Sequence, residues 1–105
     1  MTTMRVLGVD PGLTRCGIGV VDALGGRRAR LVHAGVIRSE SESPLDARLL
    51  SIARGLRAAL EEFAPDAVAV ERVFSQNNIS TVMGTAQVSG IALLEAAERG
   101  IPTAL

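Results

Sequence analysis

The sequence of 105 residues contains one cysteine, Cys16, one histidine, His33, and no tryptophan, tyrosine or lysine. A single cysteine cannot form an intramolecular disulfide, and no cluster of cysteine and histidine offers a zinc site. No apolar run approaches the roughly 20 residues that a membrane-spanning helix needs, and the first residues lack the apolar segment of a signal peptide. We therefore expect a cytoplasmic protein with no membrane partner, in which Cys16 is buried and His33 lies at a surface or sheet edge.

The positive charges are all arginines, and eleven Arg balance eleven Asp and Glu to give a formal net charge of zero. Zero net charge removes the overall electrostatic argument for nucleic-acid binding, so a polyanion would have to be held locally. Six of the arginines fall within residues 1–38, which contain only two acids. They are candidate phosphate contacts or solvated strand-edge residues, and we favour the second role for Arg27, Arg28 and Arg30.

The hydrophobic fraction of 48% indicates a folded domain, and its pattern predicts one α/β domain over residues 1–105. Short apolar segments bounded by Pro-Gly and Gly-Gly predict three strands in an antiparallel meander, at residues 5–10, 16–22 and 30–38. A further strand at 67–71 follows a helix, so a right-handed crossover makes it parallel to an earlier strand. A fifth strand is expected within residues 101–105.

Two helices complete the predicted fold. The first begins with Ser43 as N-cap and Pro44 at the first helical position, and it ends at Pro65. Its apolar residues recur every three or four positions and predict a face that packs on the sheet: Leu45, Leu49, Ile52, Leu56, Leu60 and Phe63. The second helix, at 78–99, contains several small residues, including Gly84 and Gly90, which predict close approach to a neighbouring element.

Asp10 and Glu71 each end a predicted strand. If the two strands are parallel neighbours, they lie about 4.8 Å apart and the two carboxylates can share a cation. Both acids also fall on the side of their strands that carries small residues, which leaves room above the strand ends. Two carboxylates at close range repel each other, and Mg²⁺ relieves that repulsion through oxygen ligands. The alternative is structural: Asp10 caps the Pro11-Gly12 turn, and Glu71 pairs with Arg72 or Arg15.

Two segments near these acids suit nucleic-acid contacts. In the hairpin after Asp10, backbone N–H groups and the Thr14 hydroxyl can contact phosphates, although the same residues also form an ordinary turn. After Glu71, Phe74 either stacks on an unpaired base or belongs to the core. Arg72, Gln76 and Asn77 can hold phosphates beside it. For Arg15, as for Arg72, phosphate contact and surface solvation both stay open.

The segments VLGVDPGLTRCGIGVVD and VAVERVFSQNN, followed by GTAQVSGIALLEAA, resemble the RuvC family of bacterial Holliday-junction resolvases. The resemblance implies a ribonuclease-H-like mixed sheet with helices and a homodimer that cleaves a four-way DNA junction symmetrically. It also implies that Asp10 and Glu71 bind Mg²⁺, two ions per active site in the complete protein. The aromatic residue Phe74 would contact junction DNA, the helix at 78–99 would form part of the dimer interface, and a branch-migration motor would be a partner.

The C-terminal part of the sequence departs from this family. RuvC-like enzymes complete the site with carboxylates on a later helix, and the only acids after Glu71 are Glu95 and Glu98 on the second helix. We therefore expect a C-terminally truncated nuclease domain, catalytically incompetent by itself. Two alternatives stay open. One is a non-catalytic dimerisation or DNA-binding fragment, and the other is a phosphate-binding domain of the ATPase or sugar-kinase class.

Overall fold

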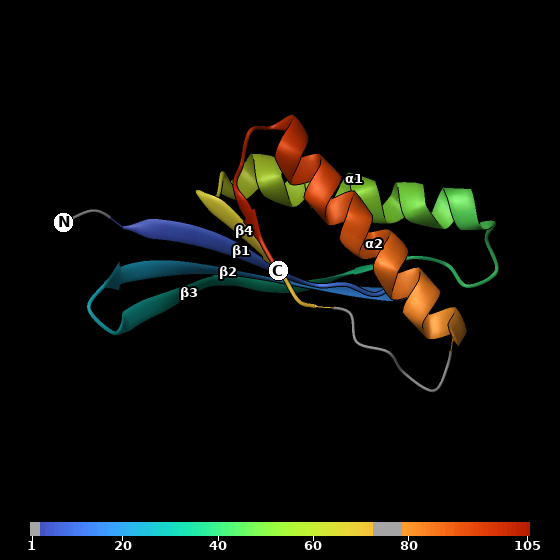
Figure 1. Ribbon diagram of the computed structural model, residues 1–105, viewed down its shortest axis with the longest axis horizontal. Helices are drawn as coiled ribbons and strands as arrows, with labels where there is room; N and C mark the ends of the chain where they lie inside the picture. Colours follow the sequence, from blue (N-terminus) through green and yellow to red (C-terminus); the bar gives the residue numbers. More distant parts are fainter. Residues whose placement is uncertain (1–2, 73–78) are drawn as a thin grey trace.

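The computed structural model describes residues 3–72 and 79–105, which form a single mixed sheet with two helices (Figure 1). The strands, in chain order, are β1 (Met4–Asp10), β2 (Arg15–Gly25), β3 (Arg28–Arg38), β4 (Ala67–Val70) and β5 (Thr103–Ala104). Their order across the sheet is β3-β2-β1-β4-β5. The first three strands pair antiparallel, β4 pairs parallel with β1, and β5 pairs parallel with β4. This arrangement confirms the predicted α/β fold.

Side chains on β1 and β4 alternate between a packed face and an open face. Leu7, Val9, Val68 and Val70 are each at most 3% exposed, because they point toward the helices. The alternate residues on the open face are small: Gly8 lies between Ala69 of β4 and Gly19 of β2 in the ladder. A period of two residues therefore divides the bulky side chains of the core from the small ones, as the sequence predicts.

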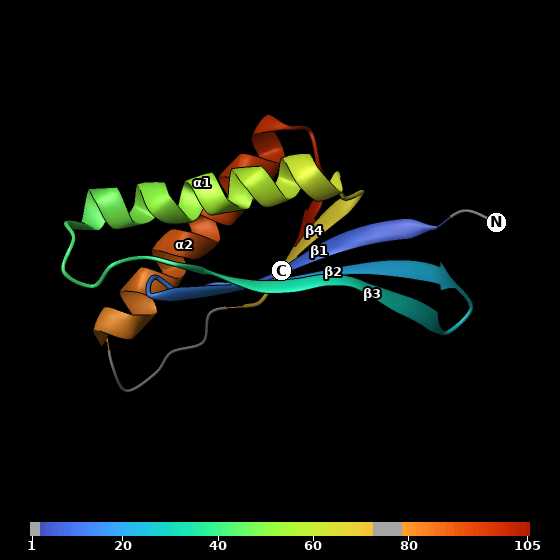
Figure 2. The same cartoon turned by 180° about the vertical axis from the view of Figure 1, so that it is seen from behind.

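Both helices, α1 (Leu45–Phe63) and α2 (Ile79–Glu98), cover the same face of the sheet (Figures 1 and 2). Ile52, Leu56 and Leu60 of α1 and Val88, Ala92 and Ala96 of α2 join the strand residues in one hydrophobic cluster. None of the described elements packs on the opposite face of the sheet. None of the described helices meets the length and hydropathy that a membrane span requires.

The start of α1 differs from the prediction. Pro44, not Ser43, is the N-cap residue, with an extended ψ of 153° and no side-chain capping bond. The Pro44 carbonyl accepts the first helical hydrogen bond from Arg48, and the Asp46 carboxylate accepts the N–H of Ala47 within the first turn. Asp46 therefore satisfies one free N–H of the first turn, that of Ala47. Leu45 is also 46% exposed rather than packed on the sheet.

Two buried acids connect the elements through ion pairs. Asp22 on β2 accepts hydrogen bonds from Arg5 at 2.8 Å and Arg30 at 2.9 Å. Glu95 on α2 accepts from Arg57 of α1 and Arg99, both at 2.9 Å. Asp22 is 5% exposed and Glu95 is 2% exposed, so each charge is removed from water and held by two guanidinium groups. These arginines therefore stabilise the fold.

Replacing Asp22 by asparagine should weaken the fold at neutral pH and flatten its acid dependence. The hydrogen bond from Arg5, and then that from Arg30, lowers the pKa of Asp22 to about 2 from its ordinary 3.8. A carboxylate with a lowered folded-state pKa stabilises the fold above its unfolded pKa, and this contribution is lost as pH falls from about 4 toward 2. Urea unfolding between pH 2 and 6 measures it. Exposed Glu62→Gln is the control, and equal pH profiles for the two variants would refute the expectation.

Candidate active site

Asp10 and Glu71 lie at the ends of two adjacent parallel strands. Asp10 is the last residue of β1, and Glu71 directly follows β4. The strand β4 ends at Val70, one residue before its predicted end. The ladder pairs Val9 with Val70, so residues 10 and 71 are the next positions in register. The Glu71 N–H also donates to the Val9 carbonyl at 3.0 Å. The backbone therefore fixes the two acids side by side.

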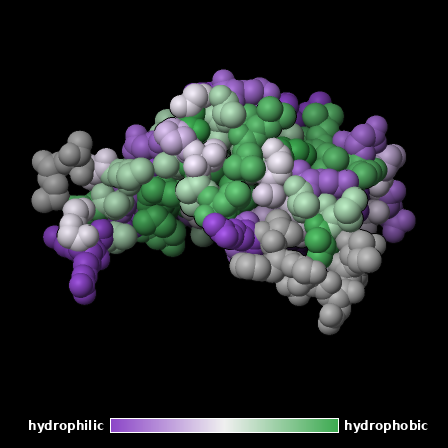
Figure 3. Space-filling model, viewed as in Figure 1, coloured by the Kyte–Doolittle hydropathy of each residue, from purple (hydrophilic) through white to green (hydrophobic). Residues whose placement is uncertain are grey.

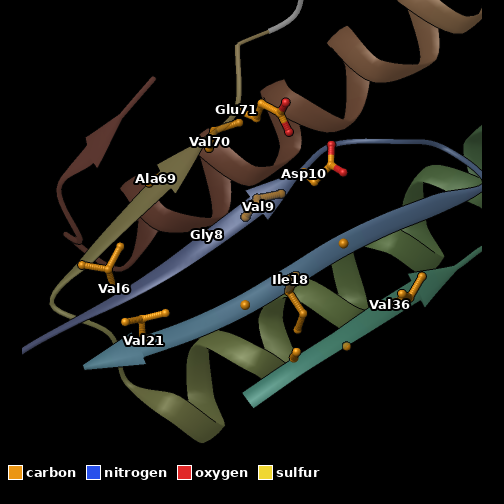
Figure 4. A pocket seen from close by; sticks show the side chains of 14 residues that line it. Val6, Gly8, Val9, Asp10, Ile18, Val21, Val36, Ala69, Val70 and Glu71 are labelled. Carbon is orange, nitrogen blue, oxygen red and sulfur yellow. The ribbon is translucent and has the colours of Figure 1, made fainter. Parts of the chain in front are cut away.

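The two carboxyl groups lie next to each other at this edge of the sheet (Figure 4). The pKa of Glu71 is raised above its ordinary value by a side-chain hydrogen bond with Asp10, and then by the negative charge of Asp10. Such a shift is expected when two carboxyl groups lie close together, because binding of one proton relieves the repulsion between their negative charges. A divalent cation relieves the same repulsion without protonation.

Glycines on β2 make room beside Asp10. Gly17 lies opposite Asp10 in the ladder, and a Cβ at residue 17 would lie 3.4 Å from the Asp10 Cβ. A larger side chain there would press on the carboxylate. Gly17, Gly19 and Gly8 are part of an open hollow of about 890 Å³ on the bare face of the sheet. Asp10 and Glu71 stand at one end of this hollow, and its remaining lining is mostly apolar (Figure 4).

The structural alternative for the two acids finds no support in the described residues. Neither Asp10 nor Glu71 forms an ion pair with any arginine of residues 3–72 or 79–105, whereas Asp22 and Glu95 each pair with two. Arg15 and Arg72 are exposed, and neither pairs with Glu71 within the described part of the chain. Two adjacent carboxylates without a cationic partner raise the electrostatic free energy of the protein, and a bound cation would lower it.

The pair suits a hard cation such as Mg²⁺. Mg²⁺ is commonly held by one or two carboxylates and keeps several of its waters, so two adjacent acids supply a sufficient protein share. Among the described residues, no third acid, histidine or cysteine joins Asp10 and Glu71 to make a larger metal cluster. The residues present therefore fit a partly hydrated magnesium ion rather than a fully protein-enclosed one.

The loop between β1 and β2 is packed tightly below Asp10. A Cβ at Gly12 would collide with the carbonyl oxygen of Arg15, so the turn requires glycine at this position. The Gly12 N–H donates to the Cys16 sulfur, and burial raises the pKa of the Cys16 thiol. Cys16 is fully buried, as the sequence predicts, and it supports the loop as a packed side chain. His33 is exposed on the edge strand β3, also as predicted.

The other predicted site residues fall in different places. Thr14, in the loop after Asp10, and Arg15, the first residue of β2, are exposed and line a second groove of about 460 Å³. Arg72 is exposed directly after Glu71. Three predicted residues lie outside the described part of the chain: Phe74, Gln76 and Asn77. The DNA contacts proposed for these six residues stay predictions.

Arg48 is a residue of this region that the sequence did not single out. It lies on α1, 34 residues from Thr14, and its guanidinium Nη2 donates to the Thr14 hydroxyl at 3.0 Å. Its Nε donates to the Ser39 hydroxyl, also at 3.0 Å. In the sequence Arg48 is one arginine among several on an amphipathic helix, so no local pattern marks it.

The chain matches a known protein family over nearly its whole length. The profile of the family described as crossover junction endodeoxyribonuclease RuvC matches residues 6–105. The chain is 59% identical to crossover junction endodeoxyribonuclease RuvC of Leifsonia xyli over 103 residues, which cover 98% of the chain and 50% of that protein. It is 61% identical to the protein of the same name from Paenarthrobacter aurescens, covering 98% and 54%. The chain belongs to the RuvC family.

A solved structure shows the same fold. The structure described as T. thermophilus RuvC in complex with Holliday junction substrate superposes with a TM-score of 0.88 at 35% sequence identity. The match covers 97% of this chain and 62% of that one. The chain thus spans about half the length of the curated relatives named above. The family match also favours the nuclease interpretation over the ATPase or kinase alternative.

Replacing Asp10 by asparagine should lower the pKa of Glu71 toward its ordinary value. Asparagine keeps the shape of the side chain but removes the carboxylate whose hydrogen bond, and then whose negative charge, raises the pKa of Glu71. A ¹³C NMR titration of the Glu71 carboxyl measures the shift, and Mg²⁺ added to the unsubstituted chain should lower the same pKa. Asp46→Asn on α1 serves as the control. An unchanged Glu71 pKa in Asp10→Asn would show that the two carboxylates do not interact.

Proposed function

We propose that this chain forms part of an endonuclease that resolves four-way DNA junctions by Mg²⁺-dependent hydrolysis of phosphodiester bonds in recombination and repair. The observation that carries the proposal is the adjacent pair Asp10 and Glu71, which has no cationic partner among the described residues. The family supports the reaction, and the relative solved with a Holliday junction supports the substrate. The proposed setting is the cytoplasm.

In this proposal Asp10 and Glu71 would hold Mg²⁺, two ions in the complete protein. When bound, the metal supplies an activated water and neutralises charge at the departing 3′ oxygen. Asp10 is well placed for this role because the β1–β2 ladder fixes its backbone. Gly17, which has no side chain, leaves space beside the Asp10 carboxylate. Thr14 and Arg15 would hold a phosphate beside the site, while Arg72, Phe74, Gln76 and Asn77 would contact the junction near its unpaired bases.

A non-catalytic role for this chain alone has a specific observation in its favour. The described residues bring only two acids together, whereas the resemblance implies further carboxylates for the complete site. Binding of a junction without cleavage is therefore the second candidate. It shares the fold and the DNA contacts with the first, and differs only in the outcome of the reaction.

Junction cleavage should need both Mg²⁺ and the two acids. The test incubates the chain, and a form extended past Leu105 with the corresponding segment of a relative, with a four-way junction and a linear duplex, with and without Mg²⁺. We expect cleavage of the junction by the extended form and a loss of at least 100-fold on Asp10→Asn or Glu71→Gln, because each removes a charged metal ligand.

Glu98→Gln, an exposed acid on α2, is the matched control and should cleave like the unsubstituted protein. Binding without cleavage by either form would favour the non-catalytic role. Mg²⁺-dependent cleavage that survives Asp10→Asn would refute the proposed site, and ATP hydrolysis without junction cleavage would refute the proposed function.

The proposed homodimer has a candidate surface on α2. Met83 and Leu94 are each 55% exposed, and Ala86, Gly90 and Ala97 are exposed at helical spacing between and after them. Apolar side chains gather along this helix on the face seen in Figure 3. A Cβ at Gly90 would meet no atom within 4 Å, so nothing in the described chain requires a glycine there. A branch-migration motor as a further partner is proposed on the resemblance alone.

Leu94→Glu should abolish this dimer, because a charge in a packed apolar interface is left without water or a partner. Sedimentation equilibrium of the variant measures the change in association constant, which we expect to fall at least 100-fold. Val36→Glu is the matched control, since Val36 is 51% exposed on the bare face of the sheet. Dissociation by Val36→Glu but not by Leu94→Glu would place the contact on the sheet instead.

A further inference from the structure

The groove beside the β1–β2 loop has the chemistry of an anion site. It is separate from the hollow at Asp10 and Glu71, and its volume is about 460 Å³. Four parts of the fold contribute to it: the β1–β2 loop, the first residue of β2, and the first turns of α1 and of α2. Its lining contains two arginines, three threonines and no acid: Gly12, Leu13, Thr14, Arg15, Arg48, Thr81, Gly84 and Thr85.

Arg48 holds the loop side of this groove in place. Its Nε donates to the Ser39 hydroxyl, which in turn donates to the Leu13 carbonyl at 2.5 Å. The Ser39 N–H donates to the Thr14 carbonyl at 3.2 Å. The guanidinium of Arg48 therefore connects α1 to Thr14 directly and to Leu13 through Ser39, two of the loop residues that line the groove. Gly84 of α2 closes the other side, because a Cβ there would lie 3.2 Å from the Leu13 Cβ.

The same contacts point hydrogen-bond donors at the groove. The Thr14 hydroxyl accepts from Arg48 Nη2, so its own O–H is the group's remaining donor and is left for another acceptor. Arg48 Nη1 donates to no acceptor in the described part of the chain, which leaves two further N–H groups. The Thr14 hydroxyl therefore offers an O–H donor and one remaining lone pair, whereas Arg48 offers only charged N–H donors. The charged donors favour an oxyanion over a cation as the ligand of this groove.

The charges around the groove have no acidic counterpart. Arg48 and Arg15 form no ion pair within residues 3–72 and 79–105. Arg38 lies directly opposite Arg15 in the β2–β3 ladder, and like charges in this position destabilise a sheet unless an anion lies between them. Arg15, Arg38 and Arg48 thus bring three guanidinium groups without an ion pair in the described residues to the end of the sheet at which Asp10 and Glu71 lie.

We propose that this groove binds a phosphodiester group of the nucleic-acid backbone, with Arg48 as its charged donor and the Thr14 hydroxyl as its neutral one. The nucleic acid is identified by the proposed function, on which this inference rests. The phosphate lies outside the Asp10 and Glu71 pair, so the groove positions the substrate and takes no part in bond cleavage. A phosphate contact of this kind fixes register and carries no sequence preference.

The test measures DNA affinity as a function of salt in EDTA, where no cleavage occurs. Arg48→Ala should weaken binding to a four-way junction and to a linear duplex alike, by roughly ten-fold. It should also reduce the slope of log K against log salt by about one, the value for one lost phosphate contact. Arg54→Ala, an exposed arginine on the same helix, is the matched control and should leave affinity and slope unchanged.

A second measurement separates this inference from the proposed function and from loss of fold. Inorganic phosphate titrated into the chain should move the ¹H–¹⁵N signals of residues 12–15 in the unsubstituted protein and in Arg54→Ala, but not in Arg48→Ala. Thr14→Val, which keeps the arginine and the loop, should weaken the phosphate response several-fold. Equal responses in Arg48→Ala and Arg54→Ala would overturn the groove assignment. Failure to prefer or cleave a junction would overturn the proposed function while leaving this phosphate response intact.

Discussion

The parallel pairing of β1 with β4 is the constraint on which the site depends. Asp10 and Glu71 repel each other, and free side chains on a flexible loop would separate. The ladder holds their backbones in adjacent register, with the Glu71 N–H bonded to the Val9 carbonyl at 3.0 Å. Leu7, Val9, Val68 and Val70 keep the two strands together by burial against the helices. The hydrophobic core thus holds an electrostatically unfavourable pair in place.

The acids of the chain fall into two groups that differ in their partners. Asp22 and Glu95 are buried, and each is bonded to two arginines, so their pKa values are lowered. Asp10 and Glu71 are exposed, and the hydrogen bonding and then the charge of Asp10 raise the pKa of Glu71. The first pattern stabilises a fold by satisfying buried charge, and the second leaves charge unsatisfied where a ligand can reach it. The pKa of Glu71 therefore shifts in the opposite direction to those of the structural acids Asp22 and Glu95.

The strands, their antiparallel meander and the parallel direction of β4 could be predicted from the sequence because they depend on short-range patterns. The position of β4 beside β1, which brings Asp10 and Glu71 together, entered the prediction only as a condition, because it depends on a pairing between residues far apart in the chain. Alternation of small and bulky residues fixes the faces of a strand, and an intervening helix makes β4 parallel. The arginine partners could not be predicted, because such contacts join residues far apart in the chain. Arg5, a candidate phosphate contact, and Arg30, expected to be a solvated strand-edge residue, both bind Asp22. Arg48 binds Thr14 across 34 residues. The expected Ser43 cap is wrong because the helix begins one residue later, with Pro44 as the N-cap residue.

The bare face of the sheet beside the two acids has a consequence for how strongly they act. Val6, Val21, Val36 and Ala69 give the hollow an apolar floor, so the only source of strong screening there is water. Any surface that covers this floor and displaces the water lowers the local dielectric constant. Coulomb attraction between the carboxylates and a cation then grows in proportion. What lies over this face accordingly tunes the strength of ion binding at its rim without contacting either carboxylate.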